Sequence, residues 1–209
     1  LFKSLLYITL FGFASCQRIA DSDSGKLTCV INTFDSQISC INHSENSTDN
    51  LYIGLEDGCI IQRTDTASQT YSINSNRRIY DIVEFSEDSL FIGTRDAGLK
   101  LFQKSKQQTQ TYTIKGKNTN YSVYSIALDR PNHLLYVGTS NGLFQLDLQK
   151  LNETKELTLV SLGKYANNCS INKLLVKDNA LYLAADVGMF IIRDSKTDFD
   201  RPVIDSLTT

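Results

Sequence analysis

The sequence has little of the material that metal and acid–base chemistry use most. It holds two histidines, one methionine and no tryptophan in 209 residues. His43 and His133 are too few for a His-rich metal site and offer little to histidine-based catalysis. An excess of one charge is also lacking, because 21 Lys+Arg against 23 Asp+Glu give a formal net charge of −2. This balance excludes the strongly basic surface typical of phosphate-backbone binding, so we expect no nucleic acid partner.

An apolar run follows Lys3, from Leu5 to Ala14, and it is too short to span a bilayer. Its length suits a signal peptide, and Phe13-Ala14-Ser15-Cys16 resembles a bacterial lipobox, whose cysteine becomes the acylated first residue of the mature protein. We expect residues 1–16 to be a signal peptide with lipid on Cys16, and residues 17–26 to be a flexible tether. The expected location is periplasmic or at the cell surface, with the membrane touched only through this anchor. The alternatives are cleavage near Ala14 or Ala20 without lipid, and a structural first strand.

Self-comparison shows one pattern four times. Each copy has an apolar strand that ends in a small residue, a turn with a glycine, and a second apolar strand. The copies are Leu51 to Gly54, Leu90 to Gly93, Leu135 to Gly138 and Leu181 to Ala184, with turn glycines Gly58, Gly98, Gly142 and Gly188. The pattern predicts hairpins, in which Asp57-Gly58 and Asn141-Gly142 take the positive φ angles of primed turns and Asp96-Ala97-Gly98 forms a longer turn.

A further strand is expected on each side of every hairpin. Apolar strands precede the hairpins at Ile38 to Ile41, Ile79 to Val83, Val123 to Leu128 and Ile171 to Val176. Polar, Thr-rich strands follow at Thr70 to Ile73, Thr111 to Ile114 and Leu157 to Val160. Four strands that recur about every 40 to 45 residues are typical of the blades of an all-β β-propeller.

The expected blades cover residues 37–73, 78–114, 122–160 and 170–205, and a β-sandwich is the alternative fold. We expect a fragment of a larger propeller that forms an arc, with an open four-bladed ring as the alternative. Small residues at Gly93 and Gly138 predict close approach of neighbouring blades.

The second and third repeats resemble a known family. Phe91-Ile92-Gly93-Thr94 with Gly98-Leu99, and Tyr136-Val137-Gly138-Thr139 with Gly142-Leu143, are similar to the repeat of the two-component regulator propellers. The first and fourth repeats depart from it, with Leu55 and Ala184-Ala185 in place of its threonine and glycine-threonine, so a generic WD40-like propeller is the fallback. The resemblance implies an exported sensor module, which in kinase-linked members continues into a membrane span and a kinase. A protein-interaction scaffold lipoprotein is the alternative function.

Five cysteines and five Asn-x-Ser/Thr sequons bear on modification. Cys29, Cys40, Cys59 and Cys169 are either disulfide-bonded or buried free thiols, and Cys59 is expected in the core position of Leu99, Leu143 and Met189. Without C-x-x-C spacing we expect no metal and no cofactor. The sequons imply glycosylation only in a eukaryotic source, and they lie at Asn42, Asn46, Asn120, Asn152 and Asn168.

We expect binding rather than catalysis, because His43 and His133 lie in separate repeats and no carboxylates are paired as in glycosidases. Loops that join successive repeats, and turns within the hairpins, should converge on one face of a propeller. Arginine and lysine beside asparagine amides there suit an anionic group or sugar hydroxyls. The main expectation is a loop cluster of three cations and one amide, namely Arg77, Arg78, Lys117 and Asn120. The further candidates for contact with an extracellular ligand or protein partner are Arg95, Asp96, Asn141 and Asp186, and solvated turns are the alternative at each position.

Overall fold

The computed structural model describes residues 15–16, 31–32, 36–44, 50–73, 75–114, 121–162 and 168–193. The chain divides into two compact units, Leu1–Gln37 and Ile38–Thr209. In the first unit, β1 (Ser15–Cys16) pairs antiparallel with β2 (Ile31–Asn32), and Cys16 lies opposite Ile31. The expected tether, residues 17–26, lies outside the described residues. Within the described part of the chain, no helix is long and apolar enough to cross a membrane.

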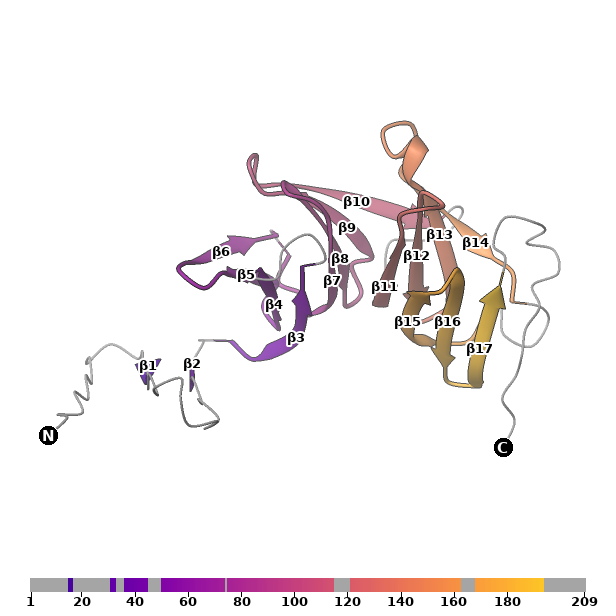
Figure 1. Cartoon of the computed structure of the whole chain (residues 1–209), viewed down its shortest axis with the longest axis horizontal. Helices are drawn as coiled ribbons and strands as arrows, with labels where there is room; N and C mark the ends of the chain where they lie inside the picture. The colour runs from indigo at the N-terminus through magenta and orange to yellow at the C-terminus, as the bar shows by residue number, and fades with distance from the viewer. Residues whose placement is uncertain are drawn as a thin grey trace, which may run out of the picture. The chain divides into compact units, whose positions relative to one another are not determined.

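The described residues of the second unit form four consecutive antiparallel meanders, which we number 1 to 4 (Figure 1). Meander 1 contains β3 (Ile38–His43), β4 (Leu51–Leu55), β5 (Cys59–Arg63) and β6 (Ser68–Ser72). Meander 2 contains β7 (Ile79–Ser86), β8 (Ser89–Thr94), β9 (Leu99–Gln103) and β10 (Gln108–Ile114). Meander 3 contains β11 (Val123–Asp129), β12 (Leu134–Thr139), β13 (Gly142–Asp147), the 3-10 turn η1 (Leu148–Lys150) and β14 (Glu156–Val160). Meander 4 contains β15 (Ile171–Lys177), β16 (Ala180–Ala185) and β17 (Gly188–Arg193).

The predicted all-β class is confirmed, and the expected first strands are present as β3, β7, β11 and β15. The outer strand expected after β17 lies among residues that are not described. The sequence did not predict the link between meanders 2 and 3. Their last strands, β10 and β14, pair in parallel over Thr113↔Glu156 and Ile114↔Leu157, which joins the two meanders into one eight-stranded sheet.

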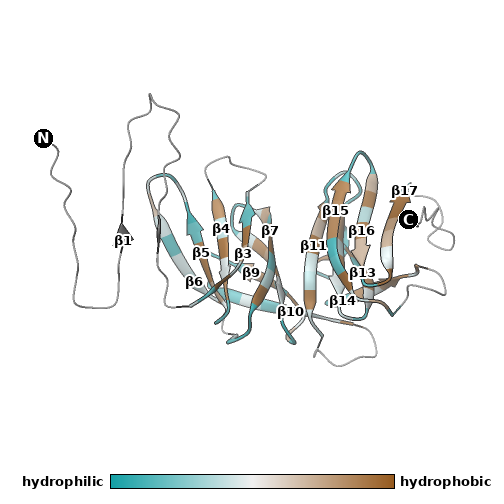
Figure 2. Cartoon of the chain, turned by 90° about the horizontal axis from the view of Figure 1, so that it is seen from below, coloured by the Kyte–Doolittle hydropathy of each residue, from teal (hydrophilic) through white to brown (hydrophobic). Residues whose placement is uncertain are grey.

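In meanders 1 to 3 burial falls from the second strand to the last one. Every residue of β8 is buried, whereas Tyr71 is the one buried residue of β6. Figure 2 shows the same contrast as brown, hydrophobic segments in β4 and teal, hydrophilic ones in β6. These second strands are covered on both faces, whereas the last strand meets solvent.

The turns differ from the prediction at two places. Gly58 and Gly142 have φ angles of 84° and 108°, but Asp57 and Asn141 are not left-handed, so these are not the expected primed turns. A left-handed glycine after an ordinary turn is the second common way to close a hairpin. A pair of left-handed residues does occur at Asp178-Asn179, between β15 and β16.

The close approach predicted at Gly93 and Gly138 is confirmed. A Cβ on Gly93 would lie 2.8 Å from the carbonyl oxygen of Val123, and one on Gly138 would lie 3.0 Å from the carbonyl oxygen of Ile171. Glycine thus lets each second strand approach the first strand of the next meander.

The prediction for Cys59 is wrong. Cys59 is half-buried, and Ile60 is the residue that lies opposite Gly54, as Leu99 lies opposite Gly93. The alignment of this repeat with the others is displaced by one residue at the β4–β5 turn. Cys59 pairs with Ser72 of β6 and has no partner on β4.

A register shift recurs near the start of every first strand. It falls between Ile38 and Cys40 in β3 and between Ile79 and Asp81 in β7, and equivalent shifts occur in the first strands of the other two meanders. The extra residues are Ser39, Tyr80, Tyr124 and Asn172. A bulge bends a strand and redirects its side chains. The side chains are therefore redirected at equivalent positions in all four first strands.

Candidate functional site

The loops before the first strands meet the turns between second and third strands, as the sequence predicted for one face. Gly98 in the β8–β9 turn donates its backbone N–H to the carbonyl of Tyr121, which precedes β11, at 3.0 Å. Gly142 in the β12–β13 turn donates in the same way to Cys169, which precedes β15, at 2.8 Å. These bonds tie each turn to the loop that begins the next meander. We call this side of the second unit the loop face.

Asp96 is held in place on the loop face. Its φ angle is 51°, and its carboxylate accepts a hydrogen bond from the hydroxyl of Ser122 at 2.9 Å. The Ser122 oxygen in turn accepts from the backbone N–H of Asp96 at 3.1 Å. Arg95 lies 3.5 Å from the same carboxylate. Asp96, expected as a ligand contact, therefore has a structural role in joining meanders 2 and 3.

Arg78 is occupied within the protein. Its guanidinium pairs with Glu56 at 3.1 Å and lies over the ring of Tyr80, 5.3 Å from the ring centre. Its backbone carbonyl accepts from Arg95 at 2.9 Å. Arg78 thus stabilises the loop between meanders 1 and 2, whereas its neighbour Arg77 is exposed.

A hollow of about 470 Å³ opens beside Arg77. It brings Arg77 and Asp96, two of the residues expected from the sequence, together with Lys100 of β9. Its remaining lining is small or polar, and consists of Ser75, Asn76, Ala97 and Thr111. We call this feature the loop-face hollow.

Lys100 is the unusual group of this hollow. Its ammonium donates to the hydroxyl of Thr111 at 3.1 Å, and among the described residues it makes no ion pair. The nearby carboxylate of Asp96 is bound by Ser122 and Arg95. Burial lowers the pKa of Lys100, because desolvation disfavours the charged form. A partly desolvated cation without a counter-charge beside a hollow is suited to an anion.

Two bulge residues form an aromatic pair beside the loop before β7. The rings of Tyr80 and Tyr124 lie 5.1 Å apart at an angle of 71°, edge to face. Both side chains are half-buried, and the guanidinium of Arg78 covers Tyr80. The bulges thus give the first strands of meanders 2 and 3 a shared aromatic contact.

Asp81 connects the first strands below this pair and is 1% exposed. Its carboxylate accepts from Asn42 on β3, and from the Ser125 hydroxyl and Ile126 N–H on β11 at 3.0 and 2.9 Å. The ammonium of Lys173 on β15 lies 3.6 Å away. One buried carboxylate therefore has partners on the first strands of meanders 1, 3 and 4, and it is a structural rather than an accessible group.

The other expected site residues are dispersed or undescribed. Lys117 and Asn120 lie outside the described residues, so the expected cluster with Arg77 and Arg78 stays a prediction. Asn141 is half-buried and donates its N–H to Thr139 at 3.0 Å, and exposed Asp186 donates its N–H to Ser170 at 3.1 Å. Both are turn residues of their own hairpins.

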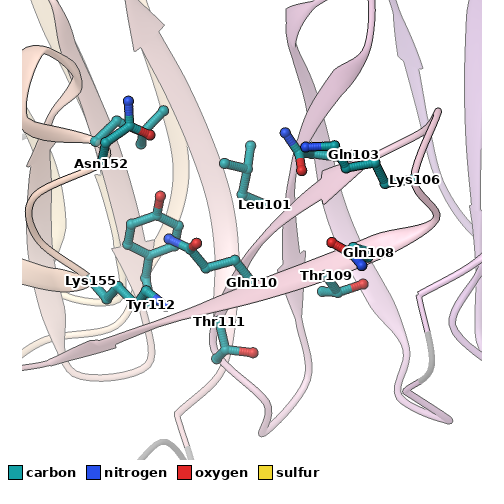
Figure 3. Close-up of a pocket in the computed structure, with 11 residues that line it drawn as sticks. Leu101, Gln103, Lys106, Gln108, Thr109, Gln110, Thr111, Tyr112, Asn152 and Lys155 are labelled. Carbon is teal, nitrogen blue, oxygen red and sulfur yellow. The ribbon is translucent and has the colours of Figure 1, made fainter.

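A second hollow, of about 550 Å³, lies along β10 and shares Thr111 with the loop-face hollow (Figure 3). Gln103, Gln110 and Asn152 contribute amides, and Tyr112 lies beneath them, fully buried. Figure 3 shows Asn152 and Lys155 entering from meander 3. We call this feature the outer groove, and nothing in the sequence had indicated it.

Three cysteines and both histidines are spread over the second unit. Cys40, Cys59 and Cys169 are free thiols, and Cys29 lies outside the described residues. His43 ends β3 on meander 1, and His133 lies in the β11–β12 turn of meander 3 with a φ of 55°. In the described ranges no three His, Cys, Asp or Glu side chains gather as a metal site would require.

Comparison with known proteins gives similarity at the level of fold. No family model and no curated protein matches the sequence. Among solved structures, the extracellular domain of the putative hybrid two component system BT4673 from B. thetaiotaomicron is similar, with a TM-score of 0.59 and 19% identity. That match covers 77% of this chain and 21% of the other, so this chain spans about a fifth of its length.

A second structure of the BT4673 extracellular domain, described as a putative one component system, matches with a TM-score of 0.59 and 18% identity. The computationally designed Ika4 protein matches with a TM-score of 0.54 and 15% identity, over 76% of this chain and 92% of its own. The similarity to extracellular domains of a two-component system agrees with the coarse family resemblance drawn from the repeats.

Proposed function

We propose that this chain is an exported sensor module, built as a β-propeller, that binds an anionic ligand or an anionic group of a partner in the loop-face hollow. The fold similarity to extracellular domains of a two-component system supports the sensor role. The repeats that resemble two-component regulator propellers support it independently.

The propeller interpretation rests on how the meanders pack. Each second strand approaches the first strand of the following meander through a glycine, at Gly54, Gly93 and Gly138. Among the described residues, extensive contacts between meanders join only consecutive ones. Antiparallel units stacked in chain order, four-stranded in meanders 1 to 3 and with polar last strands outside, have the organisation of propeller blades. In this interpretation meanders 1 to 4 are the blades expected from the repeats.

Lys100 is the observation that carries the ligand class. Partial desolvation of an ammonium without a carboxylate partner costs free energy, and pairing with a bound anion offsets this cost. Arg77 at the same hollow supplies a second cation, whose guanidinium can bind a carboxylate or phosphate through two parallel hydrogen bonds. We therefore favour an anionic group over a neutral ligand, and recognition over catalysis.

The test compares thermal stability in phosphate, sulfate and citrate with stability in sodium chloride of the same ionic strength. A ligand that binds the folded state raises Tm as its concentration exceeds Kd. We expect at least one of the three anions to raise Tm above the chloride control, and Arg77→Ala to remove most of that rise.

Lys100→Met separates binding from folding. Removing an uncompensated cation should leave stability in chloride unchanged or higher, and it should abolish the anion-dependent rise. Lys106→Met is the matched control, because exposed Lys106 lies in the β9–β10 turn away from this hollow and the variant has the same net charge. An equal response in both variants, or no response of the wild type to any of the three anions, would contradict the proposal.

A further inference from the structure

The contact that joins consecutive meanders occurs three times with the same residues in the same places. Gly54, Gly93 and Gly138 face Ile79, Val123 and Ile171, the first residues of the following first strands. A Cβ on these glycines would lie 3.0, 3.3 and 3.2 Å from the Cβ atoms opposite. Each meander therefore has a front face with a β-branched residue and a back face with a socket for the next one.

The front face of meander 1 carries the same kind of residues, but no described meander packs against them. Ile38 occupies the position of Ile79, Val123 and Ile171, which are all fully buried, yet it is 45% exposed. Ile41 occupies the position of Ile82, Ile126 and Leu174, which are at most 4% exposed, yet it is 57% exposed. Two isoleucines thus lie in solvent where every counterpart is covered.

The back face of meander 4 shows the complementary situation. Ala184 occupies the position of the three glycines and is exposed, whereas those glycines are buried. Met189 lies opposite Ala184, as Leu143 lies opposite Gly138, and it is 40% exposed whereas Leu143 is fully buried. Leu175, the counterpart of buried Ala127, is also exposed. Figure 2 shows β17 as a largely hydrophobic strand.

Stacked repeats in solution normally end in units whose outer face is polar. Here the front of meander 1 and the back of meander 4 carry the apolar residues of an internal interface instead. The isoleucines on the front of meander 1 are of the kind that cover the back faces of meanders 1 to 3, and the back of meander 4 has no such cover among the described residues. The two uncovered faces of this chain are therefore complementary to each other.

We propose that a second copy of this chain docks head to tail, with Ile38 and Ile41 of one copy packed against Ala184, Met189 and Leu175 of the other. The contact would use the same two faces as the interface that joins meanders 1 to 4, with the strands slightly further apart to fit the Cβ of Ala184. It is heterologous, because two different faces meet. It does not involve the loop-face hollow, so it stands or fails separately from the proposed anion binding.

Disulfide trapping between two single variants tests this arrangement. A disulfide needs a Cβ to Cβ distance of about 3.5 to 4.5 Å, slightly more than the 3.0 to 3.3 Å that a Cβ on the internal glycines would have. We expect an equimolar mixture of Ile38→Cys and Ala184→Cys, under mild oxidation, to form a covalent dimer that neither variant forms alone.

Leu159→Cys is the matched control, because Leu159 is an exposed apolar residue on the outer strand β14. Its mixture with Ile38→Cys has the same native cysteines, and we expect no dimer above the level of either variant alone. Equal dimer yields in the two mixtures would overturn the proposal.

Sedimentation of the whole chain gives a second, independent readout. We expect wild-type protein to associate as its concentration rises, and Ile41→Asp to be monomeric at the same concentrations without a lower Tm, since Ile41 is exposed. A wild type that is monomeric at every concentration tested would overturn the proposal and leave the two faces to further meanders of a longer chain.

Discussion

Gly93 and Val123 lie so close that any side chain at the glycine would meet Val123 itself. A Cβ there would stand 2.8 Å from both the carbonyl oxygen and a methyl group of Val123. We expect Gly93→Val to lower the free energy of unfolding by roughly 1 to 3 kcal/mol through overpacking, measured by chemical denaturation. Ala184→Val, at the exposed equivalent position, should change it by less than about 0.5 kcal/mol in dilute protein. Equal effects would contradict the repeat alignment.

Asp81 should be the most sensitive polar residue of the second unit. Asp81→Ala leaves the Ser125 hydroxyl and the Ile126 N–H without their acceptor, and each buried donor left unpaired costs roughly 1 to 3 kcal/mol. Lys173→Met removes only an exposed partner of the same carboxylate, so its expected cost is below about 1 kcal/mol. Denaturation of both variants measures the difference, and a tolerated Asp81→Ala would show that the carboxylate does not join the first strands.

Stability should fall in alkaline solution. Burial raises the pKa of the Cys40 thiol from 9.0 to about 12, and it raises the pKa of Tyr112 and Tyr121 from 10.0 to about 12. As the pH rises, the unfolded chain therefore loses these protons at lower pH than the folded chain does. The contribution of these groups to the free energy of unfolding is complete below about pH 9 and is lost progressively between pH 9 and 12. Tm measured across this range should decline, and Tyr112→Phe should make the decline less steep. A flat profile would contradict the burial of these groups.

The N-terminal motif gives a prediction about location. In a bacterial host we expect Cys16 to carry lipid and Cys16→Ser to release the protein from the membrane fraction. Fractionation with mass spectrometry of the mature N-terminus measures both. A serine variant that stays in the membrane with an uncleaved N-terminus would contradict lipid anchoring.

Much of the fold could be predicted from the sequence because the repeats carry local signals. Alternating apolar residues and turn glycines locate the hairpins, and the small residues at Gly93 and Gly138 indicate close packing. The one-residue error at Cys59 arose because the β4–β5 turn differs from the others, and spacing alone does not show which residue is unpaired.

The site was less accessible to sequence reasoning. Arg77 and Asp96 were expected from their loops, but Lys100 lies on a strand, and its burial depends on the approach of Thr111 from β10. Its signal was a lysine between Leu99 and Leu101, in the apolar part of the strand. The pairing of β10 with β14, and the outer groove beside it, depend on contacts between separate meanders and leave no local pattern.

The most direct measurement is the pKa of Lys100. It is measured by NMR of lysine labelled at the side chain, with and without saturating phosphate, sulfate or citrate. Burial lowers this pKa in the free protein. An anion bound in the loop-face hollow favours the charged ammonium, so we expect the pKa of Lys100 to rise when an anion binds, with exposed Lys106 as the internal reference. A Lys100 pKa that is unchanged by all three anions would contradict the central claim.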